Sequence, residues 1–581
     1  MTPPRWGTGR PPRPEGARPG RWSWADAVVA VGVAVLLFVV VRAGSGTAVS
    51  FVPSRGGPLG ADPGHLPYYA VRSLLRMFAA LALSLLFALV YAYAAAHSRR
   101  LERVLIPLLD VLQSVPVLAF LTVAVSGFAA LLPGSTLGLE CASVFAIFTS
   151  QAWNMAFAFH HSIIRTPREL DELSRDLGFT RWMRFWRIEL PGGAIPLVWN
   201  AMMSFGGGWF FLVASEMVTV RNGGRALPGV GAYAGRAIAA GSLRDVGWAI
   251  ATMAVMVVGV NFLFWRPLVA WAERFKVEQS EAPEVQRSLV LDLLRRARWP
   301  RMLARALAPV GEAAGRAGRV FGRDGRSFGA SRRRRRAGDA AFATVVVVAV
   351  GWGAVDLVRY LDDRTGLGVF GEPLLLGLAT LARVVVLIAV ATLVWVPIGV
   401  RIGLSPRLTR VAQPAVQVLA SFPANFLFPL ATWFFVRTGL PLNLGGILLM
   451  ALGAQWYILF NAIAGAMAVP TDLREAMDDL GLRGWRRWRR LIAPAVFPAY
   501  VTGAVTASGG AWNASIVSEI VAFGGTTLTA TGLGAYVAHA AEAGDHPRLF
   551  AGVTVMALYV VGMNRLLWRR LYRLAERRYS L

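Results

Sequence analysis

The sequence predicts an all-α polytopic membrane protein built from two tandem six-helix transmembrane domains. The chain is 55% hydrophobic, and its mean hydropathy is +0.51. Apolar runs recur that approach the length of about 20 residues needed to cross a bilayer. A single segment in lipid satisfies its backbone polar groups by forming a helix, and the runs lack the alternation of barrel strands. The two halves of the chain also repeat one register.

Six apolar runs fall in each half, and each is expected to be one membrane span. The first six lie at about 24–42, 71–96, 107–132, 141–164, 194–218 and 246–265. The second six lie at about 341–358, 374–400, 414–436, 444–469, 497–521 and 547–568.

The register of the first half returns in the second. Arg383 lies 307 positions after Arg76 (383 − 76), and Gly481 lies 303 positions after Gly178 (481 − 178). A single four-residue length change between the third and fourth spans accounts for both offsets. Because each half has an even number of spans, the repeat is parallel, which predicts two halves related by an axis along the membrane normal.

The domain boundaries follow from shifts in composition. Residues 1–23 are rich in Pro, Gly and Arg and are expected to form a disordered basic tail. The first transmembrane domain is expected at 24–275, a basic cytoplasmic linker at 276–340 and the second domain at 341–581. The run after the tail is long for a signal peptide and lacks a convincing small-residue cleavage site, so it is expected to remain as the first span.

The formal net charge is +27. Nucleic-acid binding is one interpretation of such a charge. The basic residues cluster between apolar runs, however, as they do in the cytoplasmic loops of membrane proteins. This bias predicts a multi-pass protein with both termini and the linker in the cytoplasm, no nucleic-acid partner, and contact between the linker and membrane lipid.

Cysteine and lysine each occur once in the chain, which excludes an internal disulfide and a phosphate-binding loop. The one cysteine, Cys141, cannot form an internal disulfide. The one lysine, Lys276, lies in the context FKV, so the chain holds no Gly-Lys-Ser/Thr phosphate-binding loop. If ATP drives this protein, the ATPase is therefore another polypeptide.

Two arginine-rich segments organise the rest of the chain. They are Glu172–Pro191, ELSRDLGFTRWMRFWRIELP, and Glu475–Pro494, EAMDDLGLRGWRRWRRLIAP. Each predicts an acidic helix, a break at glycine, and a second, basic and aromatic helix that ends before the proline. A compact helix–turn–helix of this kind suits docking in a partner's groove. The alternative is a surface loop bound to lipid headgroups. The second copy of the segment, in the same register, argues against this alternative.

These segments resemble the EAA loop of permease subunits of ABC importers. The residues that carry the resemblance are Glu172, Gly178, Ile188, Pro191, Glu475, Ala476, Gly481, Leu491 and Pro494. The first copy departs from the family pattern at Leu173 and Ser174, and the second at Met477 and Ala493. The resemblance implies the ABC type I importer (MetI-like) fold, with these loops seated in grooves of the ATPase subunits.

Two further features resemble the nitrate, sulfonate and taurine permeases. The first is a pair of proline-bracketed segments, Pro107–Pro116 and Pro414–Pro423. The second is a Ser-Glu pair, in SEMV and SEIV, followed by a Gly-x-Gly-Ala-Tyr sequence. The candidate translocation-path residues are Ser114, Pro116, Ser421, Pro423, Glu216 and Glu519. For the two glutamates, capping of a neighbouring segment is the alternative role.

Small residues precede both glutamates, at 206–208 and 508–510. They permit close helix contact, so the fifth and eleventh spans are expected at the pore interface. Other intramembrane polar residues are sparse, and the sequence shows no catalytic or metal-ligand constellation.

The resemblance implies a non-enzymatic permease in a bacterial-type inner membrane, most similar to permeases for a small anion. It implies two ABC ATPase subunits as partners, which would bind ATP and magnesium, and an extracytoplasmic substrate-binding protein. This chain itself is expected to carry no cofactor. Ferric iron or thiamine import is the competing assignment. An ion-gradient-driven secondary transporter is the alternative from another class, and a membrane enzyme is a third.

Overall fold

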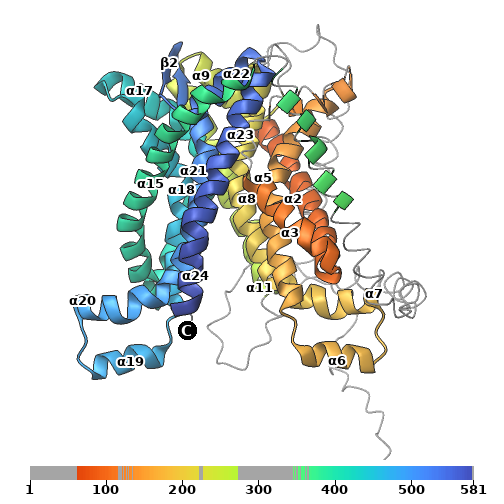
Figure 1. Ribbon diagram of the computed structural model, residues 1–581. Helices are drawn as coiled ribbons and strands as arrows, with labels where there is room; N and C mark the ends of the chain where they lie inside the picture. The colour runs from red at the N-terminus through yellow and green to blue at the C-terminus, as the bar shows by residue number, and fades with distance from the viewer. Residues whose placement is uncertain are drawn as a thin grey trace, which may run out of the picture.

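The computed structural model describes residues 62–114, 135–221, 227–272 and 366–578, with scattered positions between 121 and 133 and between 344 and 362. The expected tail 1–23, the first span and the linker 276–340 lie outside the described residues. The described elements form a tall bundle in which the two halves stand side by side (Figure 1).

The first half begins with a short 3-10 turn and continues as helices. Its elements are η1 (Pro63–His65), α2 (Leu66–His97), α3 (Arg99–Ser114), α5 (Leu137–Ile164), α6 (Arg168–Asp176), α7 (Arg181–Arg184), η2 (Phe185–Glu189), α8 (Leu190–Arg221), α9 (Val230–Ala239), α10 (Leu243–Val260), η3 (Asn261–Trp265) and α11 (Arg266–Ala272).

The second half follows the same order. Its elements are η5 (Leu367–Phe370), α15 (Gly371–Gly403), α16 (Pro406–Ser421), η6 (Ala424–Leu427), α17 (Phe428–Thr438), α18 (Leu442–Met467), α19 (Thr471–Asp479), α20 (Gly484–Arg487), η7 (Trp488–Ile492), α21 (Ala493–Ser518), β1 (Ile520–Phe523), β2 (Thr526–Thr529), α22 (Leu533–Ala543), α23 (His546–Met563), η8 (Asn564–Trp568) and α24 (Arg569–Arg578).

Seven helices in the described part of the chain are long and apolar enough to cross a membrane. They are Pro63–His97, Arg181–Met217, Leu243–Ala272, Gly368–Gly403, Leu442–Met467, Gly484–Ser518 and His546–Ala575. Each corresponds to one of the twelve expected spans, which confirms the polytopic α-helical fold.

Two other expected spans differ from simple apolar helices. The ninth, expected at 414–436, is a pair of helices bent by 75° between Ser421 and Ala424. Pro423 lies at this bend, where its missing N–H and fixed φ oppose a continuous helix. The fourth is the continuous helix α5, but polar residues such as Gln151 and Asn154 leave it outside the apolar set.

The all-α prediction and the eleventh span need one local correction. The span predicted to reach residue 521 ends at Ser518, and an antiparallel hairpin of β1 and β2 follows it. Gly524 and Gly525 form its turn, with φ of 56° and 81°. Two successive residues with positive φ suit a tight hairpin, which glycine adopts without a steric penalty.

The sequence predicted that the helix after each arginine-rich turn would end before its proline. In the structure this helix continues through the proline. The helix that starts at Arg181 runs through Pro191 into α8, and the one that starts at Gly484 runs through Pro494 into α21. A π-helical turn, η2 or η7, directly precedes each junction. Its wider i→i+5 hydrogen bonds accommodate a residue that has no N–H to donate, so the chain stays helical.

The two halves are parallel repeats with matching ends. The helix pairs α6–α7 and α19–α20 lie at one end of the bundle, here called the loop end, together with α24 (Figure 1). The helices α9 and α22 and the β-hairpin lie at the opposite end, here called the hairpin end. This arrangement agrees with the even number of spans expected per half.

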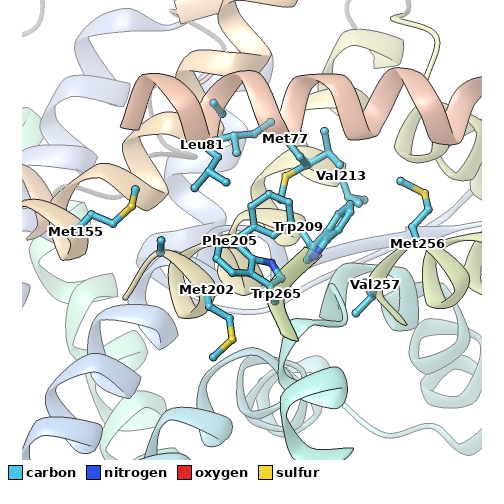
Figure 2. Packing of buried hydrophobic residues seen from close by; sticks show 14 of the residues in the cluster. Met77, Leu81, Met155, Met202, Phe205, Trp209, Val213, Met256, Val257 and Trp265 are labelled. Carbon is cyan, nitrogen blue, oxygen red and sulfur yellow. The ribbon is translucent and has the colours of Figure 1, made fainter. Parts of the chain in front are cut away.

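A close-packed apolar core holds the spans together. In the first half, Met77 from α2, Phe205 and Trp209 from α8 and Trp265 from η3 gather in one cluster (Figure 2). Trp209 is 1% exposed, and its counterpart Trp512 in α21 is 0% exposed. The equivalent tryptophans therefore anchor equivalent helices, as the repeat predicts.

Contacts between the halves are reciprocal. Helix α10 of the first half packs against α16 of the second, and α23 of the second packs against α3 of the first. At the hairpin end, the backbone N–H of Gly524 donates to the carbonyl of Ile238 at 3.1 Å. The two halves thus form one body from end to end.

Candidate functional site

A buried cluster of charged residues ties α2, α5 and α8 of the first half together. Arg76 from α2 donates from Nη1 to Glu216 Oε1 at 2.6 Å and from Nη2 to Glu140 Oε1 at 2.8 Å. Arg72, one turn earlier, also donates to Glu140. All four side chains are less than 10% exposed. Two positive and two negative charges enclosed together leave the cluster neutral, and such pairing is what burial of charge requires.

The second half has a smaller cluster at the same place. Arg383 from α15 donates from Nη1 to Glu519 Oε1 at 2.7 Å. Its Nη2 donates to Asn443 Oδ1 at 2.8 Å and to the carbonyl of Thr531 at 2.7 Å. Asn443 Oδ1 also accepts from the N–H of Thr531 at 2.9 Å. One positive and one negative charge again give a neutral cluster.

The two clusters differ at two positions, and the residues at these positions contact each other in the first half. Positions 72 and 140 carry Arg and Glu in the first half, and the equivalent positions 379 and 443 carry Ala and Asn. Changing either residue alone would leave an unbalanced buried charge. The paired exchange preserves neutrality in both halves.

Each glutamate also caps a short helix at the hairpin end. Glu216 Oε2 accepts from the N–H of Gly231 at 2.8 Å, in the first turn of α9. Glu519 Oε2 accepts from the N–H of Ala535 at 3.1 Å, in the first turn of α22. An anionic oxygen satisfies unpaired N–H groups there and complements the helix dipole. The geometry therefore matches the capping role considered as the alternative for these glutamates.

The glycines before these helices make room for the carboxylates. A Cβ at Gly229 would lie 2.3 Å from the carboxyl carbon of Glu216, and one at Gly532 would lie 2.2 Å from Glu519 Oε2. Both glycines have extended backbone, with φ of −173° and −175°. Glycine is required here by the close approach of the carboxylate.

A cavity of about 180 Å³ lies between the two halves. Its lining comes from α8 of the first half and from α16 and α18 of the second. The lining residues are Trp199, Met202, Met203, Gly206, Gly207, Gln417, Ala420, Ser421, Gly453, Trp456, Tyr457, Phe460, Asn461, Ile463, Ala464 and Met467. None of them is charged. The cavity is aromatic and aliphatic, with hydroxyl and amide groups as its polar members.

Close contacts across this interface depend on the paired glycines of α8. A Cβ at Gly206 would lie 2.8 Å from Ser421 Oγ, and one at Gly207 would lie 3.2 Å from the hydroxyl of Tyr457. Gln417 Nε2 also donates to the sulfur of Met202 at 2.7 Å. In α21 the equivalent Gly509 has no atom within 4 Å of a Cβ position. The small residues of α8, but not Gly509, thus meet the other half.

The structure places the path candidates at several different sites. Ser421 lines the cavity, and Pro423 is buried at the bend that follows it. Glu216 and Glu519 are 0% exposed within their clusters and do not line the cavity. Pro116 lies outside the described residues, and Ser114 is described only as the last residue of α3.

Each arginine-rich segment forms the predicted helix–turn–helix at the loop end. Gly178 and Gly481 both have φ of 65°, the left-handed conformation that glycine adopts at the end of a helix. The N–H of Phe179 donates to the carbonyl of Ser174 at 2.8 Å, and the N–H of Leu482 donates to that of Met477 at 2.9 Å. These bonds close the two turns in the same way.

The candidate docking residues divide by exposure. Glu172, Gly178, Glu475, Ala476 and Gly481 are exposed at the loop end. Leu491 is buried, and Ile188, Pro191 and Pro494 are partly buried where the second helix enters the bundle. The exposed members are therefore available to a partner, and the others attach the turn to its span.

Sequence reasoning missed the charged clusters, since it described buried polar residues as sparse. Arg76, Arg383, Glu216 and Glu519 had appeared only as repeat markers or path candidates. The repeat did contain a signal for these clusters. In each half, a Ser or Thr lies three residues before the arginine, and both recur together with the glutamate. Ser73 and Thr380 donate to these glutamates at 2.7 and 2.8 Å. Tyr457, whose ring lines the cavity, had no distinguishing sequence signal.

The fold and the site define a duplicated α-helical membrane protein with a cavity between its halves. The family described as "Binding-protein-dependent transport system inner membrane component" matches residues 77–269 and 395–581. The chain belongs to this family, and the family's domain occurs in it twice. It is accordingly a membrane-integral protein of a transport system.

Three curated relatives are similar to parts of the chain. The nitrate import permease of Leptolyngbya laminosa is 25% identical over 228 residues, which is 39% of this chain and 77% of that protein. The bicarbonate transport permease of Synechococcus elongatus is 27% identical over 164 residues, 28% of this chain and 56% of that protein. The taurine transport permease of Escherichia coli is 26% identical over 181 residues, 31% of this chain and 62% of that protein. The matches to the last two span less than two thirds of those relatives.

Proposed function

We propose that this chain forms the whole translocation pore of an ATP-driven importer from its two halves. The observation that carries the proposal is the pair of matching loops. Their elements begin and end 303 positions apart, with Gly178 and Gly481 at the same φ. Each loop presents an exposed glutamate at the same end of the bundle. Two ATPase subunits would dock there, one under each half, and would bind ATP and magnesium.

The cavity between α8, α16 and α18 is the proposed path for the solute. It lies at the interface of the halves, where a relative movement of the two would open or close it. Ser421 and Pro423 are proposed to shape it from the second half, and Ser114 and Pro116 would occupy the equivalent place in the first. Glu216 and Glu519 would support this path by holding α9 and α22 at the hairpin end.

The proposed solute is a small anion, in keeping with the nitrate, bicarbonate and taurine named for the relatives. With no charged side chain lining the cavity, neutral donors such as Ser421 and Tyr457 would meet the anion. An extracytoplasmic binding protein would deliver the solute at the hairpin end. The loop end and both termini would then face the cytoplasm of a cell with a bacterial-type inner membrane.

The test is purification of the tagged chain in mild detergent, with mass spectrometry of what accompanies it. We expect an ABC ATPase at two copies per chain, lost when Glu172→Arg and Glu475→Arg are combined. Glu372→Arg is the matched control, because this glutamate is exposed in the first turn of α15, at the other end of the bundle. A folded protein that brings no ATPase would contradict the proposal.

The ion-gradient-driven transporter remains the second candidate because the spans do enclose ionisable groups. The carboxylates are fully engaged, however: Glu519 accepts from Thr380, Arg383 and Ala535. Uptake into cells distinguishes the two candidates. A protonophore that abolishes uptake while cellular ATP is maintained would favour the gradient-driven transporter.

A further inference from the structure

The two loops have the same backbone but different electrostatics. Residues 168–189 contain five basic and five acidic side chains, and residues 471–492 contain six basic and four acidic ones, a formal charge of +2 (6 − 4). Two positions that are paired in the first loop carry reversed charges in the second, because Asp171 and Arg175 correspond to Arg474 and Asp478.

Ion pairs within the first loop hold its two helices together. Asp171 in α6 accepts from Arg184 in α7, and it also accepts from Arg175 Nη2 at 2.7 Å. Arg184 Nε donates to Glu189 Oε1 at 2.8 Å, and His97 contacts the same oxygen at 3.1 Å. Asp171 and Glu189 thus neutralise Arg184 from two sides.

The second loop replaces both of these acids. The positions of Asp171 and Glu189 carry Arg474 and Ile492, whereas the position of Arg184 is kept as Arg487. Ile492 packs in an apolar cluster with Val400 and Val496. The position that supplies a carboxylate to the first loop therefore supplies a second cation to this one.

Arg474 is partly buried, and one of its nitrogens lacks a partner in the part of the chain that the structure describes. Its Nε is buried and has no hydrogen-bond partner among the described residues. A buried donor on a charged group that is left unsatisfied costs free energy. The neighbouring turn presents Leu480 and Trp485, which are 72% and 73% exposed. A cation beside exposed apolar side chains is the composition of a protein docking surface.

We propose that the second loop receives a carboxylate from its ATPase subunit at Arg474, and that the first loop, whose Asp171 occupies the equivalent position, receives none. The proposal rests on the proposed function, since it assumes that both loops dock an ATPase. It makes the two docking sites electrostatically distinct, so that one ATPase contact depends on salt more than the other. An ATPase is favoured over anionic lipid because α19, which carries Arg474, is the part of this loop that extends away from the spans (Figure 1).

The experiment counts ATPase subunits per chain in the intact complex by native mass spectrometry across a salt series. For the unaltered complex we expect two subunits at low salt and one at high salt. Arg474→Asp should weaken the second site by about tenfold or more and leave one subunit even at low salt. Arg474→Ala should do the same in a milder form. Asp171→Arg is the matched change in the first loop, and it should make that site salt-sensitive as well.

The outcomes separate this inference from the proposed function. Two retained subunits in Arg474→Asp, with both lost in the combined Glu172→Arg and Glu475→Arg variant, would overturn the inference alone. Loss of anionic lipid from the Arg474→Asp complex with unchanged ATPase occupancy would assign Arg474 to the membrane and also overturn it. Absence of any ATPase from the unaltered complex would overturn the proposed function. An unchanged thermal unfolding temperature in Arg474→Ala shows that any lost subunit reflects docking.

Discussion

Arg76 and Glu216 are 140 residues apart in the chain, yet their side chains meet at 2.6 Å in the interior of the first half. Arg383 and Glu519 repeat the contact at 2.7 Å in the second half. In both halves the glutamate lies at the end of a span and reaches the first turn of the next short helix. The ion pair therefore fixes the hairpin end of the bundle, and its energetics give direct tests.

Glu519→Ala should destabilise the protein more than Glu216→Ala. Both variants leave one excess buried positive charge. After Glu216 is removed, however, Arg76 still contacts Glu140, whereas Arg383 without Glu519 keeps only the neutral oxygens of Asn443 and Thr531. Removing one member of a buried ion pair costs about 3–5 kcal/mol, and we expect Glu519→Ala to approach that range. Thermal unfolding of the purified protein in one detergent measures the order. Equal losses in the two variants would contradict a distinct role for Glu140.

The exchange of Arg72 and Glu140 for Ala and Asn predicts coupling between these two positions. Glu140→Asn alone leaves two buried arginines facing one carboxylate, so it should be strongly destabilising. Adding Arg72→Ala restores neutrality and reproduces the pattern of the second half. We expect the double variant to be more stable than Glu140→Asn by about 1–3 kcal/mol, a coupling that a double-mutant cycle measures. Additive losses would show that the two positions act independently.

Gly229→Ala and Gly532→Ala should each displace the capping carboxylate, because the new Cβ would overlap it. Overpacking of this kind costs about 1–3 kcal/mol. Gly247→Ala in α10 is the matched control, since nothing lies within 4 Å of its Cβ position. Unfolding temperatures should fall for the first two variants and stay level or rise for the control. The same temperature for all three would show that the bundle adjusts without strain.

The architecture could be predicted from the sequence to the extent that it depends on hydropathy and on the repeat. The seven confirmed spans are apolar runs, and the turns at Gly178 and Gly481 need a residue that tolerates positive φ. The bend at Pro423 was harder to place, because proline in a membrane helix is compatible with either a kink or a break. The hairpin at Ile520–Thr529 is short, and packing against α17 and α9 helps to position it.

The site was less predictable because it depends on contacts between distant segments. Arg72 and Glu140 share no motif, and only the packing of α2 against α5 brings them together. The cavity is similarly a property of the interface, formed where α8 of one half meets α16 and α18 of the other. The repeat identifies equivalent positions, but it does not show which of them face the other half.

Replacing both turn glycines with valine should disconnect the loops from their partners without preventing membrane insertion. A β-branched residue at φ of 65° is strained by about 1–3 kcal/mol, so the turn should adopt another shape. We expect Gly178→Val combined with Gly481→Val to lose the accompanying ATPase and ATP-driven uptake, while its membrane yield stays normal. Gly192→Val with Gly247→Val is the control at exposed helical positions. Unchanged uptake in the turn variant would refute the docking role of the loops.

The contact between Gly206 and Ser421 offers a size-exchange test of the cavity. Gly206→Ala places a methyl group 2.8 Å from Ser421 Oγ and should force α8 and α16 apart, lowering both uptake and thermal stability. Adding Ser421→Ala removes that oxygen. The two β-carbons are then at ordinary van der Waals distance, because Ser421 Cβ lies 3.6 Å from the new methyl position. The double variant should therefore recover stability. Gly509→Ala, the same change at the equivalent position of α21, has no neighbour within 4 Å and should be silent. If Gly509→Ala impaired uptake as much as Gly206→Ala, the path would not be confined to the α8 side of the interface, and the cavity described here would not be the route of the solute.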